Sequence, residues 1–462
     1  MEAAYICRDP YDGTSQQATA LRDTDHRAQG VSMVVGELAT RGSGVSGATA
    51  GPRVVLLEGD PAAMGVAHGR LLAAEIRLLA AEMERLLFRR VGMVLGMPLR
   101  AAALALALLM SRRIPDHIKE EMRGVARGSG LPFATILLIN TLDDILNILR
   151  QVVPRSPQTA CSGFAIWGDH TIDGLLLHGR NLDYHFKGTP IDDGGAVARL
   201  LLSQTTVLAF RPEGREPFLS IGWPGVIGVT TGVNRRGISV SNLTSYLRGN
   251  FPDGVPTAIL YRLVLEEATS LREASEILRA APRTIGNNLL VGSGVENRAS
   301  LFEITARRVE EVASEDGLLV STNHFLSADL ARLQRPYLLA HSPVRWRRLR
   351  ALCSRTGVGV EEALAFLGDR VVEEEWANPL ARVANDGTAV SVLMRPADLR
   401  LWLGGGKEPP ASVGEFRLLD GAELLSSRPS GGRDATCAPR PLPSLPQQGH
   451  QPPAREGDSA GH

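Results

Sequence analysis

The spacing of apolar residues changes near Pro154, from a mainly helical period to a mainly extended one. Upstream, residues 61–90 (PAAMGVAHGRLLAAEIRLLAAEMERLLFRR) place apolar residues at helical spacing. Downstream, short runs such as GFAIWG (163–168) and VIGVTTGV (226–233) alternate and are separated by Gly, Asn and Asp turns. A block of helices followed by strands with a few helices among them is not the strict alternation of a parallel sheet. The sequence therefore predicts a layered α+β fold.

Composition divides the chain into four segments. Residues 1–52 are rich in Gly, Ser, Ala and Thr, and residues 426–462 are rich in Pro, so both ends are predicted to be disordered. Residues 53–160 open with the strand pattern RVVLLEG and continue as a helical upstream segment. Residues 161–425 hold most of the strands and the remaining helices, and we expect them to form the main body of the fold.

The composition also excludes several classes of function. The formal net charge of +0 offers no general attraction to nucleic acid. The 4 cysteines show no C-x-x-C spacing and the histidines no H-E-x-x-H pattern, so we expect neither a disulfide framework nor a metal site. Phosphate-loop and dinucleotide-binding patterns are missing, and we expect no cofactor. The sequence gives no signal for an oligomeric state.

The longest apolar run, VGMVLGMPLRAAALALALLM, covers residues 91–110. Pro98 and Arg100 interrupt it, and the uninterrupted part is too short to span a bilayer of about 30 Å. We therefore expect a buried or interfacial helix and leave open a weak contact of residues 91–110 with a membrane surface. The first residues, MEAAYICRDPYDGTSQQ, lack a basic region followed by an apolar one. The sequence accordingly predicts no secretory signal and a cytoplasmic location.

One stretch, TACSGFAIWGDHTIDGLLLHGRNLDYHF (159–186), carries the chemistry and is predicted to form a β-hairpin. Its returning strand would bring Arg180 and Asp183 towards the end where Cys161 lies. A guanidinium near a thiol favours the thiolate, which is the form that attacks carbonyls. A nearby carboxylate can hold a protonated amine or orient a base. No histidine carries a recognisable signature for a Cys–His pair, and a G-x-S-x-G elbow is missing.

CSGFAIWG and DGLLLHGRNLDY together resemble the start of the mature chain in the N-terminal nucleophile hydrolases related to acyl-coenzyme A:6-aminopenicillanic acid acyltransferase. More distantly, they are similar to acid ceramidase, N-acylethanolamine acid amidase and the bile salt hydrolase/penicillin V acylase group. Further matching stretches extend the resemblance to roughly Val54–Leu403: LEGDPAAMGVAHGRLL, EEMRGVARGSGLPFATILLINTLDD, WPGVIGVTTGVNRRGISVSNLT, LFEIT and STNHF. The resemblance implies a four-layer αββα sandwich with a helical N-terminal pro-segment, in which residues 161–425 are the catalytic core.

The resemblance also implies roles for residues. Such enzymes cut themselves immediately before the nucleophile, here at Ala160–Cys161, where many relatives have glycine before the cysteine. Cys161 would then supply both the nucleophilic thiol and, as base, an α-amino group with an ordinary pKa of about 7.7–8.0. Asp183 would orient that amino group, and Arg180 would lie beside the thiol and lower its pKa. The side-chain amide of Asn323 would donate to the tetrahedral oxyanion.

Two further positions follow from the same resemblance. Arg345, in SPVRWRR, resembles a later arginine of the bile salt hydrolase group. Some relatives have an asparagine as a second oxyanion donor at the position of Thr244, while Asn242 lies two residues before it. A backbone N–H would serve equally well there, so the second donor stays open.

The function that the resemblance implies is cleavage of the amide bond of a small-molecule N-acyl substrate through an acyl-thioester on Cys161. The same thioester would serve an acyltransferase that passes an acyl group from a thioester such as acyl-CoA to an amine. A third alternative is a non-catalytic lipid- or ligand-binding member of the fold. The upstream segment, residues 53–160, would be either released or retained as a small subunit after cleavage.

Overall fold

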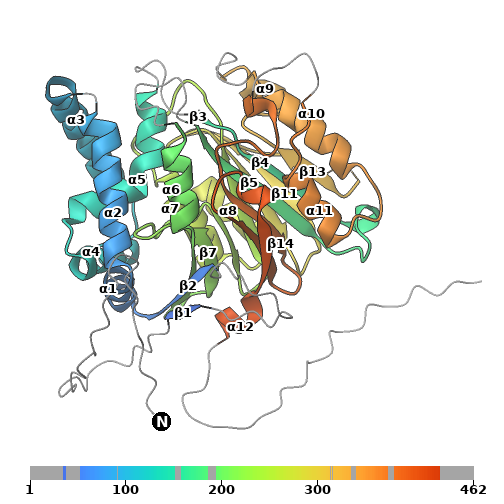
Figure 1. Cartoon of the computed structure of the whole chain (residues 1–462), viewed down its shortest axis with the longest axis horizontal. Coiled ribbons are helices and arrows are strands. Elements are labelled where there is room, and N and C mark those ends of the chain that lie inside the picture. The colour runs from blue at the N-terminus through green and yellow to red at the C-terminus, as the bar shows by residue number, and fades with distance from the viewer. Residues whose placement is uncertain are drawn as a thin grey trace, which may run out of the picture. The chain divides into compact units, whose positions relative to one another are not determined.

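The computed structural model describes residues 35–37, 52–90, 92–150, 158–185, 194–312, 314, 316–334, 340–372 and 379–426 (Figure 1). Most of the two ends predicted to be disordered, 1–52 and 426–462, lies outside the described residues; within the first of them, Val35–Glu37 forms a short strand. The chain divides into two units, Met1–Leu425 and Ser426–His462. All elements described below belong to the first unit.

Strands form two sheets, and the only parallel pair among the described strands is β2–β6. The larger sheet has the order β1 (Val35–Glu37), β2 (Arg53–Gly59), β6 (Thr206–Pro212), β7 (Phe218–Gly222), β8 (Thr231–Asn234), β9 (Ile238–Thr244), β10 (Asn287–Ser293), β11 (Arg298–Ile304) and β12 (Val309–Val312). The smaller has the order β13 (Leu318–Ser321), β4 (Ser162–Ile166), β5 (Leu177–His185), β14 (Thr388–Arg395), β15 (Arg400–Gly405) and β16 (Glu415–Asp420), and β3 (Gln158–Thr159) pairs with β5.

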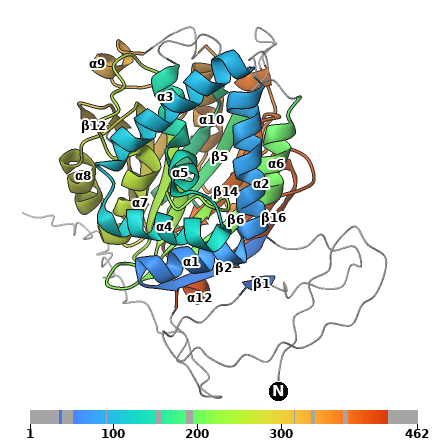
Figure 2. The ribbon, with the colours of Figure 1, turned by 90° about the vertical axis from the view of Figure 1, so that its left-hand side faces the viewer.

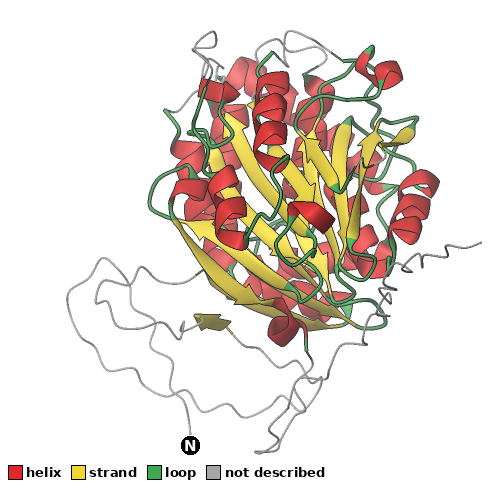
Figure 3. Cartoon of the chain, turned by 90° about the vertical axis from the view of Figure 1, so that its right-hand side faces the viewer, coloured by secondary structure: helices red, strands yellow, loops and turns green. Residues whose placement is uncertain are grey.

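Helices cover the outer face of each sheet (Figures 1–3). On the larger sheet these are α1 (Pro61–Leu71), α2 (Ala73–Glu84), the π-helical turn η1 (Arg85–Arg89), α3 (Met93–Ser111), α4 (Asp116–Ser129), α5 (Phe133–Leu149), α7 (Thr257–Glu267) and α8 (Leu271–Ala280). On the smaller sheet they are α10 (Ser342–Cys353) and α11 (Val360–Leu367). The remaining helices are α6 (Ala196–Gln204), α9 (Ala328–Ala331), α12 (Gly421–Leu425) and the 3₁₀ turns η2 (Gly168–His170), η4 (Pro379–Ala381) and η5 (Ala411–Val413). The result is the four-layer αββα sandwich, and the predicted α+β class is confirmed.

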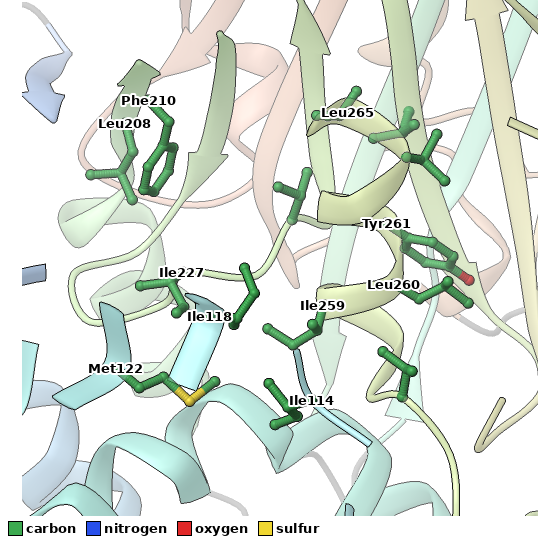
Figure 4. Packing of buried hydrophobic residues seen from close by; sticks show 14 of the residues in the cluster. Ile114, Ile118, Met122, Leu208, Phe210, Ile227, Ile259, Leu260, Tyr261 and Leu265 are labelled. Atoms are coloured by element: carbon green, nitrogen blue, oxygen red, sulfur yellow. The ribbon is translucent and has the colours of Figure 1, made fainter. Parts of the chain in front are cut away.

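The period of two decides which core each strand residue enters. In β6, Leu208 and Phe210 face the helical layer, where they share a core with Ile259 and Leu265 of α7 (Figure 4). The residues between them, Val207 and Ala209, face the other way and pack in the core between the two sheets, with residues of β14. Because β6 is buried on both faces, its successive residues enter two different apolar cores instead of alternating between apolar and polar.

The upstream segment is part of this sandwich. Its strand β2 lies between β1 and β6 and pairs with β6 along all seven of its residues, Arg53 to Gly59. Its helices α1 and α4 approach closely because glycines face each other: a Cβ on Gly65 would lie 2.1 Å from the carbonyl oxygen of Glu121. Gly69 and Gly128 repeat this contact one turn further along.

The helix predicted in residues 91–110 is present as α3, but it continues unbroken through Pro98 and Arg100, so the prediction that its apolar part is too short to span a bilayer is wrong. Proline has a φ that a helix also uses, so it removes one hydrogen bond without ending the helix here. Val94–Ser111 is the one helix in the described part of the chain that is long and apolar enough to cross a membrane. Only 22% of that window is buried, and Val94, Leu95 and Met97 are exposed.

Candidate active site

The predicted hairpin is confirmed: β4 and β5 pair antiparallel, with Ser162 opposite Asn181 and Gly163 opposite Arg180. Thr159, in β3, lies opposite Tyr184. Between these pairs the backbone N–H of Ala160 donates to the carbonyl oxygen of Asp183 at 3.4 Å. The Ala160–Cys161 peptide bond therefore lies directly beside Asp183.

Cys161 is buried, and its Sγ lies 3.8 Å from Nη2 of Arg180. Arg180 is itself fixed, because it donates to the carbonyl oxygens of Asn242 at 2.8 Å and Thr230 at 3.1 Å and to the hydroxyl of Thr231. Burial raises the pKa of the Cys161 thiol, and the charge of Arg180 lowers it by less. Arg180 thus lies beside the thiol and acts on its pKa in the expected direction, but the effect of burial on the pKa is larger.

Asp183 is a fully buried carboxyl group. Its Oδ2 accepts from the amide of Asn385, in the loop before β14, while its Oδ1 has no hydrogen-bond partner in the described part of the chain. Burial raises the pKa of Asp183 to about 7, although the charge of Arg345, the nearby hydroxyl of Thr388 and the hydrogen bond from Asn385 act in the opposite direction. A buried oxygen with two free lone pairs is costly unless a donor arrives.

Arg345, carried by α10, joins the predicted residues to one another. It donates to the carbonyl oxygen of Cys161, to Oγ of Ser162 at 2.9 Å and to Oδ1 of Asn323 at 2.8 Å. Burial lowers the pKa of Arg345 to about 10, so the guanidinium stays charged at neutral pH. The contact with His341 Nδ1 at 3.1 Å completes its fixed position.

Asn323 follows β13, and Arg345 holds the oxygen end of its side chain. Its Nδ2 consequently points towards the hairpin, donating to the carbonyl oxygen of Thr244 at 2.8 Å and lying 3.4 Å from Oγ1 of Thr159. Two residues were candidates for the second oxyanion donor. The first, Thr244, contacts Asn323 through its backbone carbonyl, which is an acceptor. Asn242 lies beside Arg180, whose Nη2 is 3.3 Å from the Asn242 Oδ1.

Several residues of the site carry no local sequence signal. The hydroxyl of Tyr246 lies 2.7 Å from Oγ1 of Thr159, and Asn385 supports Asp183 across a sequence separation of 202 residues. Ser342 donates from its hydroxyl towards Thr322 and accepts from the backbone N–H of Asn323 at 2.8 Å. Only the fold brings these groups to the hairpin.

A cavity of about 190 Å³ opens beside the hairpin. It lies between α2, α5 and α6 and reaches Thr159, Tyr184 and Thr230, whose carbonyl holds Arg180. Its wall is mainly apolar and includes Leu79, Met83, Leu87, Leu142, Leu146 and Trp223. The described residues contain no group of three or more His, Cys, Asp or Glu side chains that could hold a metal ion.

Two sheets packed face to face between helical layers, with a cysteine at the start of an inner strand, define the fold class of the N-terminal nucleophile hydrolases. Within that class the family is identified by sequence: residues 177–407 match the model of the acyl-coenzyme A:6-aminopenicillanic acid acyl-transferase family, and the chain belongs to this family. The match includes Arg180, Asp183, Asn323 and Arg345 and begins downstream of Cys161.

Individual relatives are distant. The chain is 26% identical over 272 residues to protein dcd1B of Dictyostelium discoideum, covering 54% of this chain and 50% of that protein. It is 26% identical over 212 residues to acid ceramidase of Rattus norvegicus, covering 43% of this chain and 50% of that enzyme. It thus spans about half the length of these curated relatives.

The sequence identity to solved structures is also low. The Caenorhabditis elegans ortholog of N-acylethanolamine-hydrolyzing acid amidase is 19% identical with a TM-score of 0.36, covering 51% of this chain and 93% of that one. A mutant of conjugated bile acid hydrolase from Clostridium perfringens is 16% identical with a TM-score of 0.38, covering 58% of this chain and 95% of that one.

Proposed function

We propose that this chain is a self-processing hydrolase that cuts its own Ala160–Cys161 bond and then cleaves amide bonds of small N-acyl substrates. One observation carries the proposal: the thiol of Cys161 lies beside the guanidinium of Arg180, while the unpartnered Oδ1 of Asp183 belongs to the residue beside the peptide bond to be cut. A thiol, a fixed cation and a spare buried acceptor are what the two reactions need.

Self-cleavage begins with attack of the Cys161 sulfur on the carbonyl carbon of Ala160. The sulfur–carbon bond forms, the carbon–nitrogen bond breaks, and the thiol proton passes to the departing nitrogen of Cys161. Water then hydrolyses the thioester, which leaves the Ala160 carboxylate and a Cys161 with free thiol and free α-amine. In the uncut chain Thr159 occupies the space next to Asn323, since Oγ1 and Nδ2 are 3.4 Å apart.

After cleavage the new amine supplies the donor that Asp183 lacks. An α-ammonium group at Cys161 would donate to Asp183 in a charge-assisted hydrogen bond, and in its neutral form the amine would take the thiol proton. Nδ2 of Asn323, no longer beside Thr159, would donate to the oxyanion of the substrate. Loss of one such donor typically raises the barrier by about 3 kcal/mol.

In turnover, sulfur attack on the substrate carbonyl forms an acyl-thioester, and the amine leaves with the proton that the α-ammonium returns. Water releases the acyl group and restores the thiol. The apolar cavity beside Thr159 is the proposed acyl site. If an amine replaced water the same intermediate would transfer its acyl group, and the description of the family model, which names an acyl-transferase, supports this as the second candidate.

The experiment that tests the function is to trap the acyl group on Cys161. The purified protein is mixed with an excess of an N-acyl amide or acyl-thioester, quenched in acid and digested, and peptide masses are measured. We expect the acyl mass on the peptide that begins with Cys161, a much lower amidase rate in Cys161→Ser, and no adduct there in Cys161→Ala. Turnover without any adduct, or an equal rate in Cys161→Ser, would contradict the thiol mechanism.

We also propose that α3 rests on a lipid surface. Its exposed residues Val94, Leu95 and Met97 are apolar, and exposed arginines, Arg89 and Arg112, flank the helix at its two ends. An apolar helix face with flanking cations suits an anionic membrane surface. Flotation with vesicles containing phosphatidylserine should carry the wild type and lose the Leu95→Ser/Met97→Ser variant. Equal flotation of both would contradict the contact.

A further inference from the structure

Three carboxylates line the cavity beside the hairpin, those of Glu82, Asp143 and Asp144, and the proposed chemistry uses none of them. Most polar groups in its wall are already satisfied by the protein. Asp144 accepts from the backbone N–H and hydroxyl of Thr257 and from Thr284, and it therefore fixes the start of α7. Glu82 is paired with Arg85 at 2.7 Å. These groups serve the fold.

Asp143 is different. It lies on α5 and lines the cavity, and within the described residues its carboxylate accepts one hydrogen bond, from the hydroxyl of Tyr184 to Oδ2 at 3.4 Å. None of the ion pairs among the described residues includes Asp143, and the guanidinium of Arg150, which lines the same cavity, lies over the ring of Tyr246. A carboxylate can accept about four hydrogen bonds, so most of the acceptor capacity of Asp143 is unused.

The position of Asp143 connects it to the reaction. Its donor Tyr184 follows Asp183 in β5 and packs edge-on against Trp223, with ring centroids 5.9 Å apart. Tyr184 and Thr159 line the cavity on the side of the Ala160–Cys161 bond. A ligand that occupies this cavity next to the nucleophile therefore shares it with the carboxylate of Asp143.

We propose that Asp143 is a specificity-determining residue of this site, which selects ligands whose apolar part carries an ammonium group. This inference rests on the proposed function, because it names the substrate class of the same cavity. An aliphatic wall binds any alkyl chain, but it gives Asp143 no donor beyond the hydroxyl of Tyr184. An ammonium group would satisfy the carboxylate through charge-assisted hydrogen bonds, which are about twice as strong as neutral ones.

The direction of the pKa shift agrees with this reading. Burial raises the pKa of Asp143, and Tyr184, Arg150 and Arg180 compensate only in part. The protein groups around Asp143 thus stabilise its anion only in part, and a bound cation would stabilise it further. A ligand with an ether or methyl group at the same place would bring no donor.

The test is a binding measurement at pH 7 on the full chain carrying Cys161→Ala, with two matched probes, n-octylamine and n-octyl methyl ether. Calorimetry gives the dissociation constant of each probe, and the ratio of the ether constant to the amine constant is compared between this parent and its variants. We expect the amine to bind about tenfold or more tightly than the ether, since hydrogen bonds to charged groups have this magnitude. Asp143→Asn should reduce the ratio to about one and leave ether binding nearly unchanged.

Two further variants keep the result decisive. Glu84→Gln removes one negative charge from the end of α2, at a residue that does not line the cavity and pairs with Arg100, and it should keep the tenfold ratio. Asp143→Ser repeats the test if Asp143→Asn does not fold. An unchanged ratio in the Asp143 variants, or a ratio near one in the parent, overturns the inference. The measurement requires neither cleavage nor turnover. The ammonium preference can therefore be absent while the proposed hydrolase function holds, and it can be present while that function is wrong.

Discussion

At the scale of single residues, the uncut chain holds Asp183 in an unfavourable state. Burial raises its folded pKa to about 7 from the ordinary 3.8. The folded state therefore binds the proton more tightly than the unfolded state, so the contribution of Asp183 to stability is complete below about pH 4 and is lost as pH rises towards 7. Cleavage, by placing an ammonium group beside the carboxylate, would remove this cost.

This gives a pH prediction. In the Cys161→Ala chain, which cannot cut itself, Asp183→Asn should become more stable relative to its parent as pH rises from about 4 to 7, by at most about 1.4 kcal/mol per pH unit. Urea unfolding at several pH values measures the difference, in which the other titrating groups cancel. The same pH dependence with and without Asp183→Asn would contradict the assigned pKa.

Arg345 should be required for geometry rather than for charge alone. Its planar guanidinium reaches the carbonyl of Cys161, Ser162 and Asn323 together, and a lysine ammonium cannot form that fork. We predict that Arg345→Lys slows self-cleavage at least about tenfold, close to the effect of one lost oxyanion donor. Arg348→Lys, one turn along the same helix and paired with Asp369 at 2.8 Å, is the matched control and should cleave normally.

At the scale of elements, the contact of α1 with α4 depends on glycine. A methyl group at position 65 would overlap the backbone of Glu121, whose carboxylate holds the buried Arg262 at 2.6 Å. Gly65→Ala should therefore destabilise the protein by about 1–3 kcal/mol, the usual cost of overpacking. Gly405→Ala, where a Cβ would meet nothing within 4 Å, should change little. Chemical denaturation compares the two, and equal losses would contradict the steric account.

The elements also show what sequence could predict. The helical and extended periods indicated the upstream helices, the strands and the β4–β5 hairpin, because each pattern is local. The continuity of α3 through Pro98 was not predicted, since a proline costs one hydrogen bond and neighbouring helices decide whether the helix survives it. Strand order was also beyond reach, because β13 pairs with β4 across more than 150 residues of sequence.

The site was predictable only where residues lie in a recognisable motif. Cys161, Arg180 and Asp183 share one hairpin, and Asn323 and Arg345 were found through the resemblance. Asn385 and Tyr246 come from distant loops without any pattern of their own, and Asp143 looks from sequence like one more polar residue of an amphipathic helix. Their roles depend on which side chains meet in space.

At the scale of the whole molecule, the upstream segment should remain bound after cleavage. Its strand β2 is internal to the larger sheet, and its helices share a core with β6 and α7. We predict that the two fragments elute together in gel filtration and separate only in denaturant. Release of the upstream fragment from native protein would contradict the prediction that β2 holds the halves together.

The most direct measurement of the central claim is the intact mass of the purified full-length protein under denaturing conditions. Self-cleavage at Ala160–Cys161 predicts two masses in the wild type, the downstream one beginning with Cys161, and one uncut mass in Cys161→Ala. A wild-type protein that hydrolyses N-acyl amides while showing only the uncut mass would contradict the claim.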